Sequence, residues 1–79
     1  MSNQLYAIIS RVMSITITEI TSDSSRSSIP NWDSFNMFVL LDEIEQELNV
    51  KFSLEEIVEI ETVGDIEKII NSQGVNFDN

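Results

Sequence analysis

Apolar residues recur at the spacing of an α-helix in three separate parts of this chain. Because an α-helix has about 3.6 residues per turn, residues three and four positions apart lie on one face. A fourth, short helix is predicted where "SLEE" (53–56) forms a capping box, in which a serine and a glutamate satisfy each other's backbone N–H groups. The predicted helices cover residues 3–15, 34–49, 54–59 and 63–72. The chain is therefore expected to be all-α, a small four-helix bundle.

The connection between the first two helices, residues 16–33, is long. Its "SITITEI" alternates apolar and hydroxyl residues, which favours a strand, but no second strand follows, so we expect an extended segment. "TSDSSRSSIP" (21–30) has no periodicity and is predicted to be a mobile loop. Beyond the last helix, which Gly74 follows, we expect a frayed tail over 73–79. Residues 1–79 thus read as one domain with a long first loop and a short third helix.

The predicted second helix has apolar residues on more than one side. Asp33 is its expected N-cap. Phe35 and Val39 project almost opposite to the core-facing arc, and Phe38 lies at the margin between them. The arc that can face the core contains Met37, Leu40, Leu41, Ile44 and Leu48.

The charge of the chain limits its partners. Fourteen acids against four bases give a net charge of −10. Between Asp33 and Glu67 there are eleven acids and one base, Lys51. Nucleic-acid binding is not expected, because it depends on neutralising phosphates with Lys and Arg. A protein with a basic patch would be attracted. The alternative is a solvated acidic surface that only aids solubility.

No segment approaches the roughly 20 apolar residues that a membrane span needs. The amino terminus, "MSNQLYAIIS", has neither a basic leader nor a continuous apolar run, so a signal peptide is not predicted. We therefore expect a soluble, monomeric cytoplasmic protein without membrane insertion.

Most catalytic constellations are excluded by composition. The chain has no histidine and no cysteine, so a conventional triad, a thiol nucleophile and an imidazole base are all missing. "DEIEQE" lacks the glycine turn and ligand spacing of a calcium loop. Adjacent helical carboxylates such as Glu55 and Glu56 diverge, and so small a bundle has little room for a dry cleft. We expect no enzyme activity, no catalytic residue and no dedicated metal site.

Ser34 lies where the long loop becomes the second helix. A serine there commonly serves as a cap or first-turn residue. Phe35 and Val39, however, form an apolar patch within reach of Ser34, and apolar patches rimmed by acids usually mark protein-binding surfaces. The alternative is that the loop or other helices cover these two side chains.

Asp33-Ser34-Phe35, followed by "LDEIEQELNVKF" and "TVGDIEKII", resembles the acyl carrier protein family, the phosphopantetheine-dependent carriers. The resemblance extends over nearly the whole chain. It implies that Ser34 accepts 4′-phosphopantetheine from coenzyme A, transferred by a phosphopantetheinyl transferase that brings its own base and magnesium. Asp33 matches the aspartate that helps to place this magnesium. An arm ending in a thiol would supply the thioester chemistry that a chain without cysteine lacks.

The resemblance also implies a function. The chain would carry acyl intermediates as thioesters and deliver them to loading and processing enzymes with basic docking patches. Phe35, Val39 and Asp42 depart from the usual residues of fatty-acid carriers, which indicates a specialised lipid or secondary-metabolite pathway. Phe35 is familiar from D-alanyl carriers, so an aminoacyl, D-alanyl or peptidyl carrier is an alternative. An unmodified acidic interaction module is another.

Docking to these enzymes is expected on the second and third helices, through weak and salt-sensitive contacts. The expected docking residues are Phe35, Phe38, Val39, Asp42, Glu45, Glu55, Glu56 and Glu59. An acyl chain tucked between the helices would contact Leu40, Ile44, Ile57, Ile60 and Ile69, although any small bundle core needs the same residues.

Overall fold

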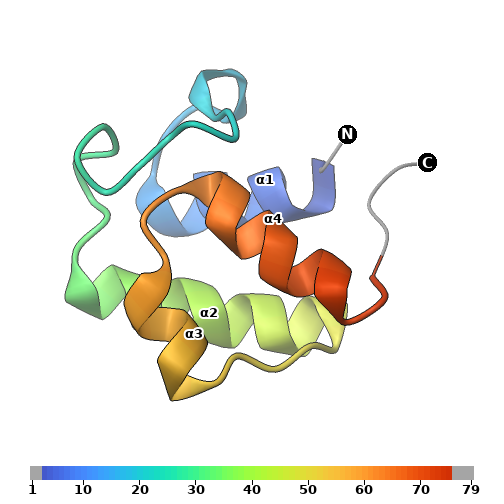
Figure 1. Cartoon of the computed structure of the whole chain (residues 1–79). Helices are drawn as coiled ribbons and strands as arrows, with labels where there is room; N and C mark the ends of the chain where they lie inside the picture. Colours follow the sequence, from blue (N-terminus) through green and yellow to red (C-terminus); the bar gives the residue numbers. More distant parts are fainter. Residues whose placement is uncertain (1–2, 76–79) are drawn as a thin grey trace.

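The computed structural model describes residues 3–75, which form four α-helices and one short 3-10 helix. In Figure 1, α1 passes behind α4, and α2 lies below α1 and passes behind α3. The bounds are α1 Asn3–Met13, η1 Ile17–Glu19, α2 Ser34–Leu48, α3 Leu54–Glu59 and α4 Val63–Ser72. The all-α, four-helix prediction is confirmed. Within residues 3–75, no helix is long and apolar enough to cross a bilayer. The predicted tail lies outside the described residues from 76 onward.

Three helices end in residues with positive φ. Ser14 (φ 58°) ends α1 two residues before the predicted boundary, and the N–H of Ile15 donates to the carbonyl of Ser10 at 3.2 Å. This 6→1 bond is the one that closes a Schellman motif. Asn49 (φ 59°) ends α2, and Gly74 (φ 91°) follows α4. Of these three residues, only Gly74 adopts a positive φ without steric cost, because glycine has no Cβ.

The segment predicted to be extended contains a 3-10 turn, η1, so the prediction is wrong for Ile17–Glu19. Thr16 and Ile20, on either side of this turn, have extended backbone angles, and the N–H groups of Glu19 and Ile20 donate to the carbonyls of Thr16 and Ile17 at 2.9 and 3.2 Å. Without a neighbouring strand, the backbone groups of this segment find partners within the segment itself. Ile20 is buried, whereas Ile17 is 40% exposed.

The segment predicted to be a mobile loop, residues 21–30, is bonded to the start of α4. The N–H groups of Val63 and Gly64 donate to the carbonyls of Ser24 and Ser22 at 2.9 and 2.8 Å. Ser25 forms an isolated antiparallel bridge with Thr62. The first N–H groups of a helix have no partner within the helix, and here the loop supplies carbonyls for two of them.

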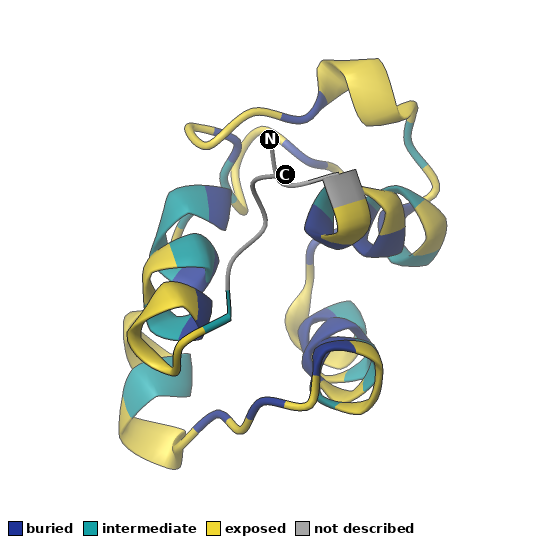
Figure 2. Ribbon diagram, turned by 90° about the vertical axis from the view of Figure 1, so that its right-hand side faces the viewer, coloured by how far each residue is buried: buried dark blue, intermediate teal, exposed yellow. Residues whose placement is uncertain are grey.

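The core is shared by helices and loops. Figure 2 shows the buried residues on the sides of α1, α2 and α4 that face one another. On α2, the buried residues are those of the predicted arc: Met37, Leu40, Leu41, Ile44 and Leu48. Outside the core, the guanidinium of Arg11 on α1 forms ion pairs with the carboxylates of Glu43 and Glu47 on α2, with N–O distances of 2.8 and 2.7 Å. The connecting segments add Ile20, Ile29, Trp32, Val50, Phe52 and Ile60.

Candidate functional site

Ser34 is the first residue of α2 and its side chain is exposed. The preceding residue, Asp33, is the N-cap: its Oδ1 accepts from the N–H of Asn36 at 2.8 Å, as predicted for a helix start. No hydrogen bond joins the Ser34 hydroxyl to another residue of the described range. The cap is therefore formed by Asp33, and the hydroxyl of Ser34 is left open to solvent.

The backbone around Ser34 is held from both sides. Asn36 Nδ2 donates to the carbonyl of Asn31 at 2.8 Å, and Asn31 Nδ2 donates to the carbonyl of Met13 at the end of α1 at 2.8 Å. Trp32 is buried, and its Nε1–H donates to Met37 Sδ at 3.2 Å. These contacts fix the place where the loop becomes α2, and so fix the position of the hydroxyl.

The start of α2 suits an anion. The helix is 15 residues long and has no acidic residue in its first turn. Its unpaired N–H groups and aligned peptide dipoles favour negative charge at this end. A phosphodiester on Ser34 would therefore sit at the positive end of a helix dipole. On this chemistry, the residues present fit a phosphate-linked group.

The aromatic neighbours of Ser34 face solvent. Phe35 is 74% exposed and Phe38 is 60% exposed, whereas Val39 is half-buried. The interpretation in which other elements cover Phe35 therefore does not hold. The predicted patch of Phe35 and Val39 is, in the structure, centred on Phe35 and Phe38.

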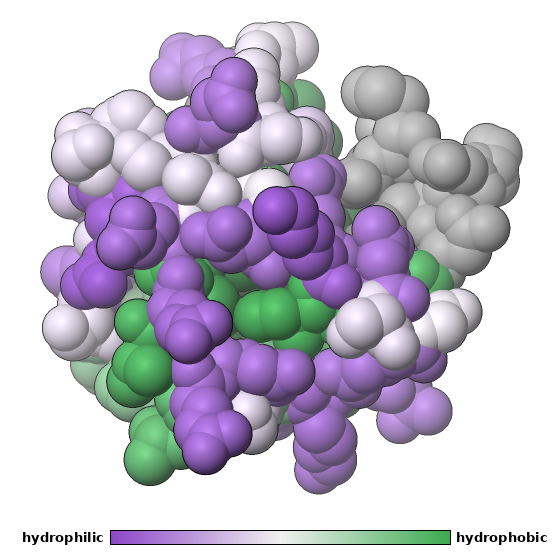
Figure 3. Space-filling view, viewed as in Figure 1, coloured by the Kyte–Doolittle hydropathy of each residue, from purple (hydrophilic) through white to green (hydrophobic). Residues whose placement is uncertain are grey.

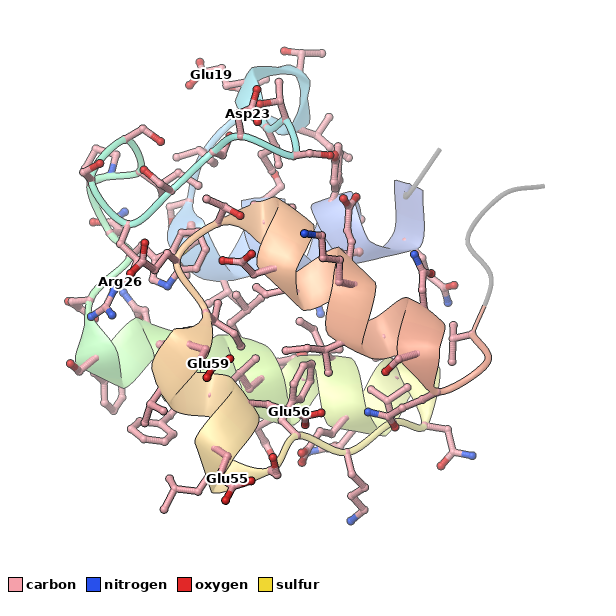
Figure 4. The ribbon with its side chains drawn as sticks, viewed as in Figure 1. Glu19, Asp23, Arg26, Glu55, Glu56 and Glu59 are labelled. Atoms are coloured by element: carbon pink, nitrogen blue, oxygen red, sulfur yellow. The ribbon has the colours of Figure 1, made fainter. Side chains whose placement is uncertain are left out.

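The acids of the expected docking surface divide into three groups by their hydrogen bonds. Glu45 Oε2 accepts from the N–H of Phe52 at 2.9 Å, and Glu56 Oε1 accepts from the N–H of Ser53 at 2.9 Å, in the predicted capping box of α3. These carboxylates hold the α2–α3 connection. Glu55 and Glu59 are exposed on α3 (Figure 4), without a hydrogen bond or ion pair to another described residue. Asp42 is exposed and accepts from Gln46 Nε2 at 2.9 Å.

Two exposed residues of α3 were missed by the sequence analysis. Leu54 is 73% exposed and Val58 is 72% exposed. Their spacing of four residues placed them on one face, but that spacing does not say whether the face is buried or open. In the space-filling view, hydrophobic side chains gather over α3 and the beginning of α2 (Figure 3). We call Phe35, Phe38, Leu54 and Val58 the apolar face.

Most of the residues expected to contact an acyl chain are packed in the hydrophobic core. Leu40, Ile44 and Ile60 are buried, and Ile57 and Ile69 are half-buried. A groove of about 180 Å³ opens between α3 and α4. It is lined by Glu56, Glu59, Ile60, Asp65, Lys68 and Ile69. Of the five residues, only Ile60 and Ile69 thus line this groove.

The model of the phosphopantetheine attachment site family matches residues 3–70. The chain belongs to this family, the phosphopantetheine-dependent carrier proteins. The predicted cofactor, 4′-phosphopantetheine, is confirmed by this membership. Carriers of this family are not themselves enzymes; they act with enzymes, among them the phosphopantetheinyl transferase.

Solved structures of acyl carrier proteins share the fold. A proposed acyl carrier protein from Mycobacterium tuberculosis has a TM-score of 0.81 and 26% sequence identity, with 91% of this chain and 96% of that chain covered. The holo acyl carrier protein from Geobacter metallireducens has a TM-score of 0.80 and 26% identity, with 89% and 80% covered. No curated protein matches the chain in sequence. The four-helix carrier fold is thus retained at low sequence identity.

Proposed function

We propose that the Ser34 hydroxyl is the attachment point of 4′-phosphopantetheine. On this arm the protein carries acyl groups as thioesters and delivers them to partner enzymes. The observation that supports this most strongly is the exposed Ser34 hydroxyl, free of hydrogen bonds to described residues, on the first residue of a 15-residue helix.

The chain's own residues have simple parts in this proposal. Ser34 presents the oxygen that becomes esterified, and the α2 N-terminus stabilises the resulting negative charge. Asp33 keeps the helix start in place through its bond to the Asn36 N–H, and it lies beside the position where the transferase would bring magnesium. The arm supplies the thiol that this chain lacks.

Intact mass spectrometry tests the attachment site directly. The protein is incubated with coenzyme A, magnesium and a broad-specificity phosphopantetheinyl transferase. Wild type should gain one phosphopantetheine and Ser34→Ala should gain none. Ser53→Ala is the matched control, because Ser53 is also an exposed residue at a helix start, but its hydroxyl accepts from the Glu56 N–H. Modification of Ser34→Ala, or none of the folded wild type, would contradict the proposal.

We further propose that this carrier serves a specialised lipid or secondary-metabolite pathway. Phe35, Val39 and Asp42 lie at positions where fatty-acid carriers usually have other residues, and Phe35 is the most exposed large hydrophobic side chain of the described structure. The holo protein should therefore compete poorly with a fatty-acid carrier for the housekeeping ketosynthase. Efficient use by that enzyme would refute specialisation, and loading by an amino-acid-adenylating enzyme would indicate an aminoacyl carrier instead.

A further inference from the structure

Arg26 is the one base in the connection between α1 and α2, residues 14–33. Its side chain is exposed and forms no ion pair or hydrogen bond with another residue of the range 3–75. The other arginine, Arg11, is held by Glu43 and Glu47. A guanidinium carries five N–H donors, so Arg26 keeps all of them for another molecule.

The backbone at Arg26 is held in place by hydrogen bonds. Its N–H donates to the carbonyl of Glu61 at 3.3 Å. The residues that follow form two turns, in which the N–H of Ile29 donates to the carbonyl of Ser25 at 3.0 Å, and the N–H of Trp32 donates to the carbonyl of Ile29 at 3.1 Å. Because turns shorten the path of the chain, Arg26 lies nearer to α2 than an extended segment would place it.

The side chain of Arg26 extends from the loop toward the beginning of α2 (Figure 4). Beside it lies an open hollow of about 330 Å³. The hollow is lined by Ser25, Arg26, Ser27, Glu61 and Thr62. Glu61 is the acid of this lining, but its carboxylate forms no ion pair with Arg26 in the described part of the chain. The guanidinium thus has room for a ligand at the end of α2 where Ser34 begins the helix.

A phosphodiester on Ser34 would bring a second negative charge to this junction, next to the carboxylate of Asp33. Like charges repel at short distance, so a cation close to the phosphate lowers the cost of placing it there. Arginine suits this part, because its planar N–H groups match two oxygens of a phosphate. The lysines lie elsewhere: Lys51 follows the opposite end of α2, and Lys68 is on α4.

We propose that the guanidinium of Arg26 binds the phosphodiester of the 4′-phosphopantetheine arm, and so holds the root of the arm beside the serine-rich loop. This rests on the proposed function of Ser34. The contact forms with the attached arm, whereas the transferase brings the groups that the transfer needs. The rest of the arm, with its thiol, stays free to reach partner enzymes.

NMR of the Arg26 side chain compares the apo protein with the holo protein. The Nε–H signal of Arg26 should move when the arm is attached, because phosphate oxygens become its acceptors. The signal of Arg11 is the internal control and should stay in place, since its carboxylate partners are the same in both forms. An Arg26 signal that is identical in the two forms would overturn the proposal.

Phosphorus NMR of holo variants tests the same contact from the side of the arm. Arg26→Gln should move the phosphorus resonance away from its wild-type position, and Arg26→Lys, which keeps the charge, should move it less. Lys68→Gln, which removes the same charge from α4, should leave it unchanged. Raising NaCl from about 0.05 M to about 0.5 M should move the wild-type resonance toward that of Arg26→Gln, because salt screens an exposed ion pair. If Arg26→Gln and Lys68→Gln give the same resonance, the proposal is wrong.

Intact mass separates failure of this proposal from failure of the proposed function. Arg26→Gln should gain one phosphopantetheine as wild type does. A folded wild-type protein that gains no mass refutes the function of Ser34. If the wild type is modified but the Arg26 and phosphorus signals do not respond, only the role of Arg26 fails. If Arg26→Gln alone gains no mass, Arg26 acts in the transfer, and the proposal is again wrong. Backbone amide spectra verify that each variant is folded.

Discussion

At the scale of single residues, Asp65 shows how a local motif determines a charged group's state. Its Oδ2 accepts from the N–H groups of Glu61 and Thr62 at 2.9 and 3.1 Å, which completes the capping box of α4. The bond from Glu61 is the largest cause that lowers the pKa of Asp65 below its usual 3.8; partial burial opposes it. The ionised form is therefore favoured in the folded state.

A group whose pKa is lower in the folded state stabilises the protein above its unfolded pKa, and this stabilisation is lost as the pH falls through the folded value. Asp65→Asn should therefore be less stable than wild type at pH 7. The difference should begin to shrink below about pH 4, where the unfolded chain takes up a proton on Asp65, and should be lost as the pH falls through the lower pKa of the folded state. Urea denaturation from pH 7 to pH 3 measures this. Asp23→Asn, which removes the same charge from an exposed loop position, is the control. A difference independent of pH would show that Asp65 acts only through its shape.

At the scale of elements, the important contact is between the serine-rich loop and the start of α4. The carbonyl of Ser22 accepts from the N–H of Gly64 at 2.8 Å, and the Ser22 hydroxyl donates to Glu67 at 2.9 Å. A Cβ built on Gly64 would lie 3.2 Å from the Ser22 carbonyl oxygen. Glycine is thus used here for close approach of two backbones, although it is a poor helix former.

Gly64→Ala tests the loop contact against helix propensity. In an open helix the change would stabilise by roughly 1 kcal/mol. Here the methyl group must push the Ser22 carbonyl away and weaken the bond from the Gly64 N–H, so we expect a net loss of about 1 kcal/mol. Urea denaturation measures it, with Asn71→Ala, an exposed change on the same helix, as the control. If Gly64→Ala is more stable than wild type, the loop around Ser22 can move away from the new methyl group at little cost, and the prediction is wrong.

At the scale of the whole molecule, the core is one cluster to which the long loop contributes. Trp32 is only 4% exposed, and it packs with residues of the helices. Its indole bond to Met37 links the end of the loop to α2. The position of Ser34, two residues later, therefore depends on packing of the loop as well as on the helix itself.

Trp32→Ala should destabilise the whole protein and not only the loop. Truncating a buried tryptophan costs about 3–5 kcal/mol, out of a total of roughly 4–12 kcal/mol for a domain of this length. Trp32→Phe should cost about 1–2 kcal/mol, since it keeps much of the apolar contact. Denaturation followed by circular dichroism measures both. If Trp32→Ala costs less than 1 kcal/mol, the loop is packed independently of the core.

Much of the fold was predictable because its signals are local. The α2 core arc, the capping boxes at Ser53 and Thr62 and the Asp33 cap depend on residues at most a few turns apart along a helix. Ser34 was located at the helix start for the same reason. The family pattern that singles it out also lies within short stretches of sequence.

The tertiary structure alone decided how the segments without periodicity are arranged. The bonding of the serine-rich loop to α4 and the burial of Trp32 depend on contacts between residues distant in sequence. The roles of the glutamates were also decided by the tertiary structure. Four glutamates lie close together in the sequence, but only Glu45 and Glu56 accept hydrogen bonds from backbone N–H groups, whereas Glu55 and Glu59 do not. By itself the sequence determined the helices and the serine at the start of α2, because helix signals depend on near neighbours. Which side chains remain exposed for a partner was decided by the packing of distant segments.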